Sequence, residues 1–435
     1  MLRKQNALVV LLLVILGCFL ISYAACRSVH GPDDFDDDFD DDDDGNDSCE
    51  EPSIQPTTKA KDWLSVATPH LTRAALTENW DALDEGAEEV MKRGFKDDVA
   101  FVLFPHARDV FKHHLIGTFS ILGQWGQPSD VKRTGLFHTA YSGDLFQFAR
   151  WNAKDQGDRS TLKEIAGEEA EALIWLFGTL HRGKLADLGT VMRDDKAPDP
   201  LVPGSVLKVP HRLHGAVSVT AETAGKILTV TLADYLDQMV AVNGWRDHHQ
   251  VEHTEELFPG ILARPEIAFY WISKMCAAIR DVVEVIPPAF DNCTRTISRS
   301  DEESARDMYW GAVLSQSDVM SDDEKIEMFQ IVHHLNPFVG EPHFMLSQFA
   351  YRRNNYEIAR SEAKKALEKF YALGAAWDKR MTFQAWVAHA RMMLVRANRR
   401  LQGKASSLPL SRNQPPTSGG LPIVMLADIV DAFRL

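Results

Sequence analysis

The chain has 435 residues, of which 45% are hydrophobic and 25% are charged. This ordinary globular composition predicts two or three folded domains rather than a largely disordered chain. The net charge of −15 comes mostly from 13 acidic residues between positions 33 and 51. The rest of the chain is only mildly acidic and has no basic patch, which excludes a nucleic-acid-binding surface.

The N-terminus has the pattern of a membrane segment. Arg3 and Lys4 precede an uncharged, Leu- and Val-rich run from Ala7 to Ala25. About 19 residues in a helix reach across a hydrocarbon core of roughly 30 Å. Because the basic flank comes first, we expect residues 1–30 to form a signal-anchor. The protein would then be single-pass in the secretory-pathway membrane, with its C-terminal part lumenal or extracellular. The alternative is a cleaved signal peptide and a secreted protein, since small residues lie near Ala24.

Two further features of the sequence agree with entry into the secretory pathway. Asn46 and Asn292 each begin a glycosylation sequon, which predicts a glycoprotein if the chain is lumenal. Five cysteines are too few for a scaffold built from disulfides. Cys276 and Cys293 either form a bridge in an oxidising compartment or remain two buried thiols, and the sequence leaves both possibilities open.

Hydrophobic spacing predicts an all-α fold with an N-terminal membrane helix. Residues 31–58 are an acidic disordered stalk, because a run of like charges repels itself and cannot bury a core. Apolar residues then recur at spacings of three and four. The expected helical stretches are 63–75, 80–91, 115–125, 131–141, 165–180 and 221–242. Residues 186–216 form a Pro- and Gly-rich loop insertion in which short strands are allowed. We place one domain at 59–258, a second helical region at 259–402, and a mostly disordered tail at 403–435.

Histidines in the first domain suggest a metal site. His114 opens one predicted helix, and His138 lies in the C-terminal half of the next. Two antiparallel helices joined by a short turn can bring both imidazoles to one point. A carboxylate from a third helix would complete a site for a divalent metal such as Mn, Fe or Zn. Such an ion acidifies bound water and supplies hydroxide at neutral pH.

These residues also carry a resemblance to a known family. His114-Leu115, followed by Leu136-Phe137-His138, resembles the HD-type hydrolase pattern of the alarmone (guanosine tetraphosphate) synthetase/hydrolases. Residues 165–174 resemble that family's "FGEEVA-LV" helix, and residues 232–236 resemble its "LADRLHN" segment. The resemblance spans roughly residues 100–245. It implies an HD-like helical domain in which His114, His138 and Asp234 are metal ligands, and a small phosphorylated substrate.

The chain departs from the family at one ligand. The defining His-Asp doublet reads His138-Thr139, and the acidic pair that follows it in the hydrolases falls on Ser142 and Gly143. Asp144, one residue further on, is the candidate catalytic carboxylate. His106 or His113 is the candidate replacement ligand.

The motifs around these positions resemble a group of uncharacterised HD-like proteins. The shared pieces are Phe104-Pro105-His106, the stretch from His114 to Thr118, and the stretch from Gly135 to His138. This second resemblance implies the fold without an assigned activity.

The region at 259–402 has a different pattern. Ser321 to Glu324 reads as a capping box, and Leu346, Tyr356 and Ala359 begin a set of matches to tetratricopeptide spacing within 341–371. One clear unit favours a packed helical hairpin over a peptide-binding repeat array, and this helical region is the candidate site for a protein partner.

The expected function of the whole chain is that of a membrane-tethered, metal-dependent phosphohydrolase. An HD-fold oxygenase is the less favoured reaction. The alternative is an inactive scaffold that mediates protein interaction in the secretory pathway.

Overall fold

The structure, a computed structural model, describes residues 68–96, 105–106, 109–141, 149–182, 185, 199–238, 267–315 and 319–403. All of them belong to one compact unit, Thr57–Leu435, and the other unit is Met1–Pro56. The predicted membrane segment, the acidic stalk and residues 404–435 lie outside the described residues. No helix among the described residues is long and apolar enough to cross a membrane.

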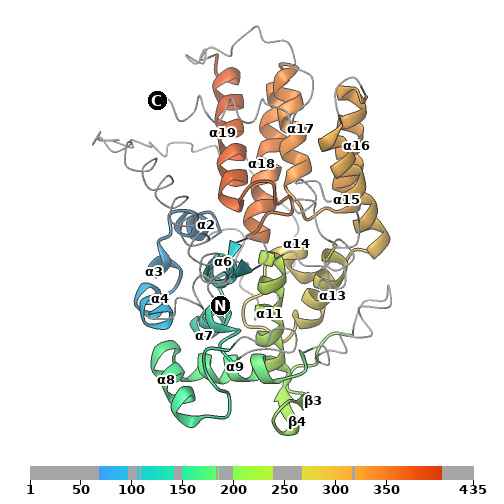
Figure 1. The fold of residues 1–435 in the computed structure, drawn as a ribbon. Helices are drawn as coiled ribbons and strands as arrows, with labels where there is room; N and C mark the ends of the chain where they lie inside the picture. The colour runs from blue at the N-terminus through green and yellow to red at the C-terminus, as the bar shows by residue number, and fades with distance from the viewer. Residues whose placement is uncertain are drawn as a thin grey trace, which may run out of the picture. The chain divides into compact units, whose positions relative to one another are not determined.

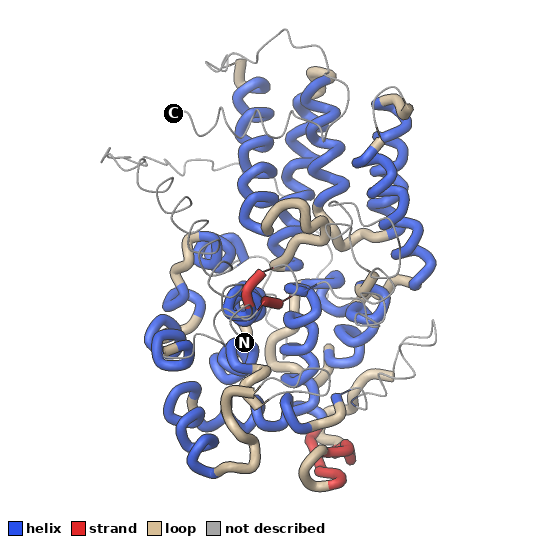
Figure 2. Tube along the Cα trace, viewed as in Figure 1, coloured by secondary structure: helices blue, strands red, loops and turns tan. Residues whose placement is uncertain are grey.

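Helices form nearly all of the regular structure of the described residues, which confirms the all-α prediction (Figures 1 and 2). The first three are α2 (Thr68–Leu76), α3 (Trp80–Leu83) and α4 (Ala87–Phe95). The predicted helix at 80–91 is therefore two helices. The break follows Leu83, because Asp84 is extended and Gly86 has a φ of 79°. Glycine reaches this left-handed conformation without a Cβ penalty, so the chain can turn there.

The next segment contains the helices on which two of the predicted ligands lie. A two-stranded antiparallel sheet of β1 (Pro105–His106) and β2 (Asp109–Val110) leads into α6 (Phe111–Gln124), α7 (Ser129–Phe137), α8 (Gln156–Ala166) and α9 (Glu168–Thr179). The predicted helix at 165–180 is wrong at its start. Gly167, at φ 100°, ends α8 and begins α9, so Ile165 belongs to the preceding helix. Apolar spacing alone could not place this break, because Ile165 and Ala166 before it and Ala170 after it are buried in the same cluster.

A β-hairpin begins within the predicted insertion and extends four residues beyond it. Strands β3 (Val206–His211) and β4 (Gly215–Thr220) pair antiparallel, and α11 (Ala221–Gln238) begins directly after them. Helix α11 contacts α6, α7, α9 and α13 (Phe269–Ile279), so it lies at the centre of the bundle (Figure 1). Its sequence explains this position, since apolar or small residues occupy nearly every turn and twelve of its residues are buried.

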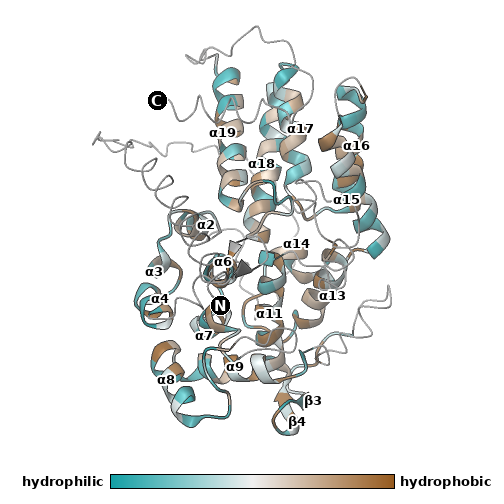
Figure 3. Ribbon diagram, viewed as in Figure 1, coloured by the Kyte–Doolittle hydropathy of each residue, from teal (hydrophilic) through white to brown (hydrophobic). Residues whose placement is uncertain are grey.

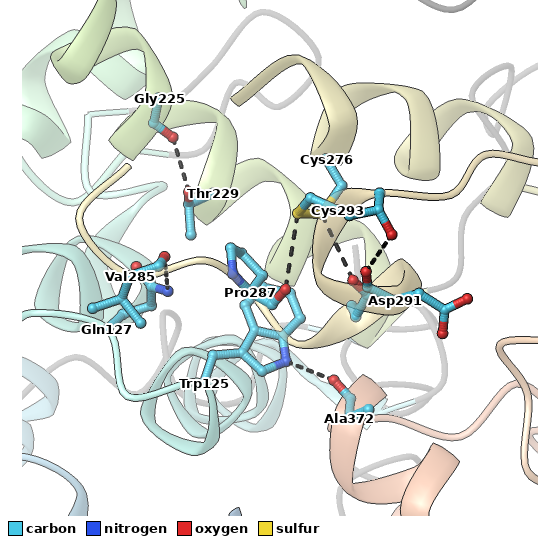
Figure 4. Close-up of a disulfide and its surroundings, with 12 residues drawn as sticks. Trp125, Gln127, Gly225, Thr229, Cys276, Val285, Pro287, Asp291, Cys293 and Ala372 are labelled. Carbon is cyan, nitrogen blue, oxygen red and sulfur yellow. Dashed lines mark hydrogen bonds between the residues drawn. A yellow bond between two sulfur atoms is a disulfide. The ribbon is translucent and has the colours of Figure 1, made fainter. Parts of the chain in front are cut away.

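A disulfide links α13 to the turn that follows it. Cys276 of α13 is bonded to Cys293 of α14 (Ala289–Cys293) (Figure 4). The sequence left open a bridge or two free thiols, and the structure contains the bridge. The residues before the second cysteine are unusual, because Phe290, Asp291 and Asn292 all have φ between 53° and 58°. Each non-glycine residue in this left-handed region costs roughly 1–2 kcal/mol. The bond ties this turn to a buried helix.

The C-terminal region consists of α15 (Arg299–Leu314), α16 (Asp322–Leu335), α17 (Glu341–Arg352), α18 (Tyr356–Leu373) and α19 (Phe383–Leu401). The predicted capping box is present, with Ser321 and Glu324 each accepting a backbone N–H of the other. Helices α17 and α18 pack as an antiparallel pair, and Ala359, Ala363 and Ala366 are fully buried. The small side chains let neighbouring helices approach closely. Each helix carries both polar and apolar positions (Figure 3).

Helix α6 lies between two apolar clusters. Leu115 and Phe119 belong to the cluster of the N-terminal helices, whereas Ile121, Leu122 and Trp125 belong to a second cluster that continues to α19. Trp125 also donates its indole N–H to the carbonyl of Ala372, at 3.1 Å. The core of the described residues therefore runs without interruption across the predicted domain boundary at 258/259.

Glu341 connects the start of α17 to the loop between α18 and α19. Its Oε1 accepts the backbone N–H groups of Trp377 and Asp378, at 2.6 and 3.0 Å, while Oε2 has no hydrogen-bond partner among the described residues. Burial raises the pKa of Glu341 from its ordinary value of 4.5 to about 7. The folded chain thus holds a proton that the unfolded chain releases above pH about 4.5. Stability contributed by this group therefore falls as the pH rises from about 4.5 to about 7.

We expect Glu341→Gln to remove this pH dependence. The amide keeps one oxygen for both backbone N–H groups and carries no charge. The variant should match wild type near pH 4.5 and exceed it by about 3 kcal/mol at pH 8. Urea unfolding at the two pH values measures the difference. The exposed Glu284→Gln is the control and should change stability by less than about 0.5 kcal/mol. A variant less stable than wild type at pH 8 would contradict this expectation.

Candidate metal centre

His114 reaches the interior from the first turn of α6. The helix follows extended Val110, and His114 is only 5% exposed while its neighbour His113 is exposed. Leu115 and Phe119 bury the adjoining face of the helix. Because Leu115 and Phe119 anchor α6 in the core, the imidazole of His114 is held in a fixed position rather than left in solvent.

His138 is the C-cap of α7, the next helix along the chain. The two helices approach closely at Gly135, where a Cβ atom would lie 2.4 Å from Leu122 Cδ1 of α6. A larger residue at position 135 would push the helices apart and separate the two imidazoles. His138 is 3% exposed, and the edge of its ring packs against Phe177 at a centroid distance of 5.3 Å.

Asp234 comes from α11, nearly one hundred residues later in the chain. The helix buries Leu232, Ala233 and Leu236 against its neighbours. This packing leaves the 6%-exposed carboxylate of Asp234 facing α6 and α7.

The three side chains meet at one point. His114 Nε2 lies 3.2 Å from Asp234 Oδ1 and 3.4 Å from His138 Nε2, and His138 Nε2 lies 3.6 Å from Asp234 Oδ1. A tetrahedral ion with donors about 2.1 Å away separates those donors by about 3.4 Å. The distances therefore fit one divalent ion, with two imidazole nitrogens and one carboxylate oxygen as donors. This donor set suits Zn, Fe or Mn.

The other nitrogen of each imidazole has an acceptor of its own. His114 Nδ1 is 2.8 Å from Asp237 Oδ2, and His138 Nδ1 is 2.7 Å from the carbonyl oxygen of Gly135. Each Nδ1 can therefore carry a proton, which leaves the Nε2 lone pair directed at the shared point. Metal-ligating histidines commonly have this arrangement.

The charges of the site favour an ionised carboxylate. Burial acts to raise the pKa of Asp234, but His138, His114 and Arg182 outweigh it and hold the pKa well below its usual range. Burial lowers the pKa of His138 to about 4, so this imidazole is neutral at physiological pH. Burial also acts to lower the pKa of His114, but hydrogen bonds to Asp234 and Asp237 raise it to about 9. This imidazole is therefore charged at physiological pH, and a bound ion would have to displace its Nε2 proton.

Two more polar side chains border the site. The guanidinium of Arg182 lies 3.9 Å from Asp234 Oδ2 and 3.8 Å from the centre of the Phe177 ring. The amide of Gln238 contacts both His114 Nε2, at 3.3 Å, and Asp234 Oδ1. The two oxygens of Asp234 are thus divided, with Oδ1 toward the histidines and Oδ2 toward Arg182.

Among the described side chains, no other predicted site residue joins this group. The backbone of His106 lies in β1, beside α6, and nothing is described of its side chain. His113 is exposed beside buried His114 and does not join the three ligand atoms. Asp144 lies outside the described residues. Sequence reasoning missed Asp237, Arg182 and Gln238. Of these, the i+3 and i+4 positions after Asp234 could have indicated Asp237 and Gln238, since both share its helix face.

Comparison with known families matches residues 99–182 to a domain of unknown function, DUF6817. The matched segment contains α6, α7, α8 and α9, and hence His114 and His138, but it ends before α11 and Asp234. No curated protein and no solved structure matches the chain.

Proposed function

We propose that this chain is an HD-like, metal-dependent hydrolase that acts on a small phosphorylated molecule. The observation that carries the proposal is the convergence of His114, His138 and Asp234, with the Nδ1 atom of each imidazole already engaged. A buried ion pair could explain one histidine beside one carboxylate. An ion at the shared point would account for all three contacts together, because the two Nε2 atoms and Asp234 Oδ1 have the spacing of metal ligands.

The residues of the site have separate proposed roles in metal binding, phosphate binding and proton transfer. His114, His138 and Asp234 hold the ion, which supplies hydroxide from bound water at neutral pH. Arg182 would bind phosphoryl oxygens, because a planar guanidinium pairs with phosphate and this one is held over the face of Phe177. Three protein ligands, the number found here among the described residues, is the number that a catalytic zinc site uses. Asp144, one residue beyond the positions of the family's acidic pair, is the proposed proton acceptor.

Phosphate release from a panel of nucleotides and sugar phosphates tests the proposal. Full-length protein would be loaded with manganese, iron or zinc before assay. We expect turnover of at least one phosphate ester or anhydride, with Arg182→Met lowering kcat/KM about 100-fold and leaving metal content unchanged. Stoichiometric metal without turnover of any panel member would favour an oxygenase or a structural site instead. Absence of metal would favour the alternative, an interaction scaffold built on the C-terminal helices.

We also propose that the described unit is lumenal, tethered by residues 1–30. The Cys276–Cys293 disulfide supports an oxidising compartment, because structural disulfides are rare in the cytosol. In sealed microsomes, residues after Ala25 are expected to resist added protease. Endoglycosidase treatment should increase gel mobility if Asn292, half-buried in the α14 turn, is modified. Digestion of the folded unit from the cytosolic side would contradict this topology.

A further inference from the structure

Helix α11 presents two carboxylates to one imidazole. Asp234 and Asp237 are three residues apart and so lie on the same face of the helix. Asp234 Oδ1 lies 3.2 Å from His114 Nε2, and Asp237 Oδ2 lies 2.8 Å from His114 Nδ1. Both nitrogens of His114 are therefore engaged by a single helix. The Asp237 side chain is 27% exposed, compared with 8% for Asp234, so Asp237 is the outer of the two.

The approach of Asp237 depends on a glycine in α6. Gly117 lies three residues after His114, and a Cβ atom placed there would be only 2.0 Å from Asp237 Oδ1. No side chain fits in that space while the carboxylate stays in place. Glycine inside a helix costs about 1 kcal/mol relative to alanine. At this position the missing Cβ is what allows the carboxylate to reach His114.

We propose that Asp237 is a positioning residue for the metal centre, and that Gly117 is the residue that admits it. Asp237 accepts the Nδ1 proton of His114, which fixes the ring orientation and keeps the Nε2 lone pair directed at the ion. This role rests on the metal site proposed above and deepens it. Partners of this kind, one step removed from the metal, typically change metal affinity 10- to 100-fold when they are lost.

Zinc affinity of the full-length protein tests the role of Asp237. Competition with a chromogenic chelator would compare wild type, Asp237→Asn, Gly117→Ala and the double variant. We expect each single variant to weaken zinc binding 10- to 100-fold. The zinc affinity of the double variant should equal that of whichever single variant binds zinc less tightly, since both changes remove the same contact.

A matched control separates this contact from a general effect of a methyl group in a helix. Gly311 lies within α15, and a Cβ atom there would have nothing within 4 Å. Gly311→Ala should leave zinc affinity unchanged. If Gly117→Ala fails to fold, Asp237→Asn still decides the question, because it preserves the size of the side chain.

A spectroscopic measurement distinguishes positioning from a merely structural role. In zinc-loaded wild type, the His114 Nδ1 proton is expected to give a low-field NMR signal that exchanges slowly with water. Asp237→Asn should abolish or broaden this signal. The role of Asp237 would be overturned by one result. In that result wild type binds zinc, both single variants have zinc affinities within about threefold of wild type, and the His114 Nδ1 proton signal is intact. Wild type that binds no zinc would overturn the proposed function itself, and this role with it.

Discussion

Replacing Asp234 with alanine is expected to abolish tight zinc binding. Wild-type protein should bind one zinc ion per chain, because the three donor atoms fit a single ion. The substitution removes the sole anionic donor of the three and leaves two imidazoles 3.4 Å apart. Loss of an outer partner already costs 10- to 100-fold in affinity, so loss of a direct ligand should cost at least about 100-fold. Equilibrium dialysis followed by elemental analysis measures the bound metal.

Asp130→Ala is the matched control for this experiment. Asp130 is also a poorly exposed aspartate of the same bundle, with a side chain 9% exposed and an ion pair to Lys226 at 2.6 Å. Its removal should lower stability but leave zinc stoichiometry and affinity unchanged. Zinc binding that survives Asp234→Ala at wild-type affinity would show that the ion, if bound, is held elsewhere.

Removal of the disulfide is expected to destabilise the protein by about 3 kcal/mol. Cys276 and Cys293 are separated by 17 residues, and closing a loop of this size lowers the entropy of the unfolded chain by roughly that amount. The double variant Cys276→Ala, Cys293→Ala should unfold at a correspondingly lower denaturant concentration. The left-handed turn at 290–292 should loosen as well, because the bond ties it to α13.

Reductant provides the control for the disulfide. Wild type treated with reductant should approach the unfolding midpoint of the double alanine variant, while the variant itself should not respond. A wild-type midpoint that is insensitive to reductant, once thiol titration shows that the bond has been broken, would contradict the expected contribution of the bond to stability.

The sequence predicted the three helices that carry the site, and the meeting of the three residues on them, for related reasons. Apolar spacing located α6, α7 and α11, and the short turn from Trp125 to Pro128 required α6 and α7 to be antiparallel neighbours. Once the three helices share a core, His114, His138 and Asp234 have little freedom to diverge. Their convergence is observed, and their role as ligands stays a prediction.

Other features depend on backbone angles and side-chain space, which the spacing of apolar residues in the sequence does not predict. The break between α8 and α9 depends on the φ of Gly167, since the apolar residues on both sides of it enter one cluster. The contact between Asp237 and His114 depends on the side-chain space above Gly117. The pairing of Cys276 with Cys293 depends on a left-handed turn of non-glycine residues, which has no signature in composition.

The loop between α18 and α19 reaches the end of α11. Lys379 donates to the backbone carbonyl of Asp237, at 3.1 Å, and Trp377 of the same loop is fully buried. The core also continues from α6 to α19, so the helix that carries Asp234 and Asp237 packs in one core with the C-terminal helices. If a partner bound these helices and altered the α18–α19 loop, any resulting change in metal affinity would be matched by an equal change in affinity for that partner when metal binds.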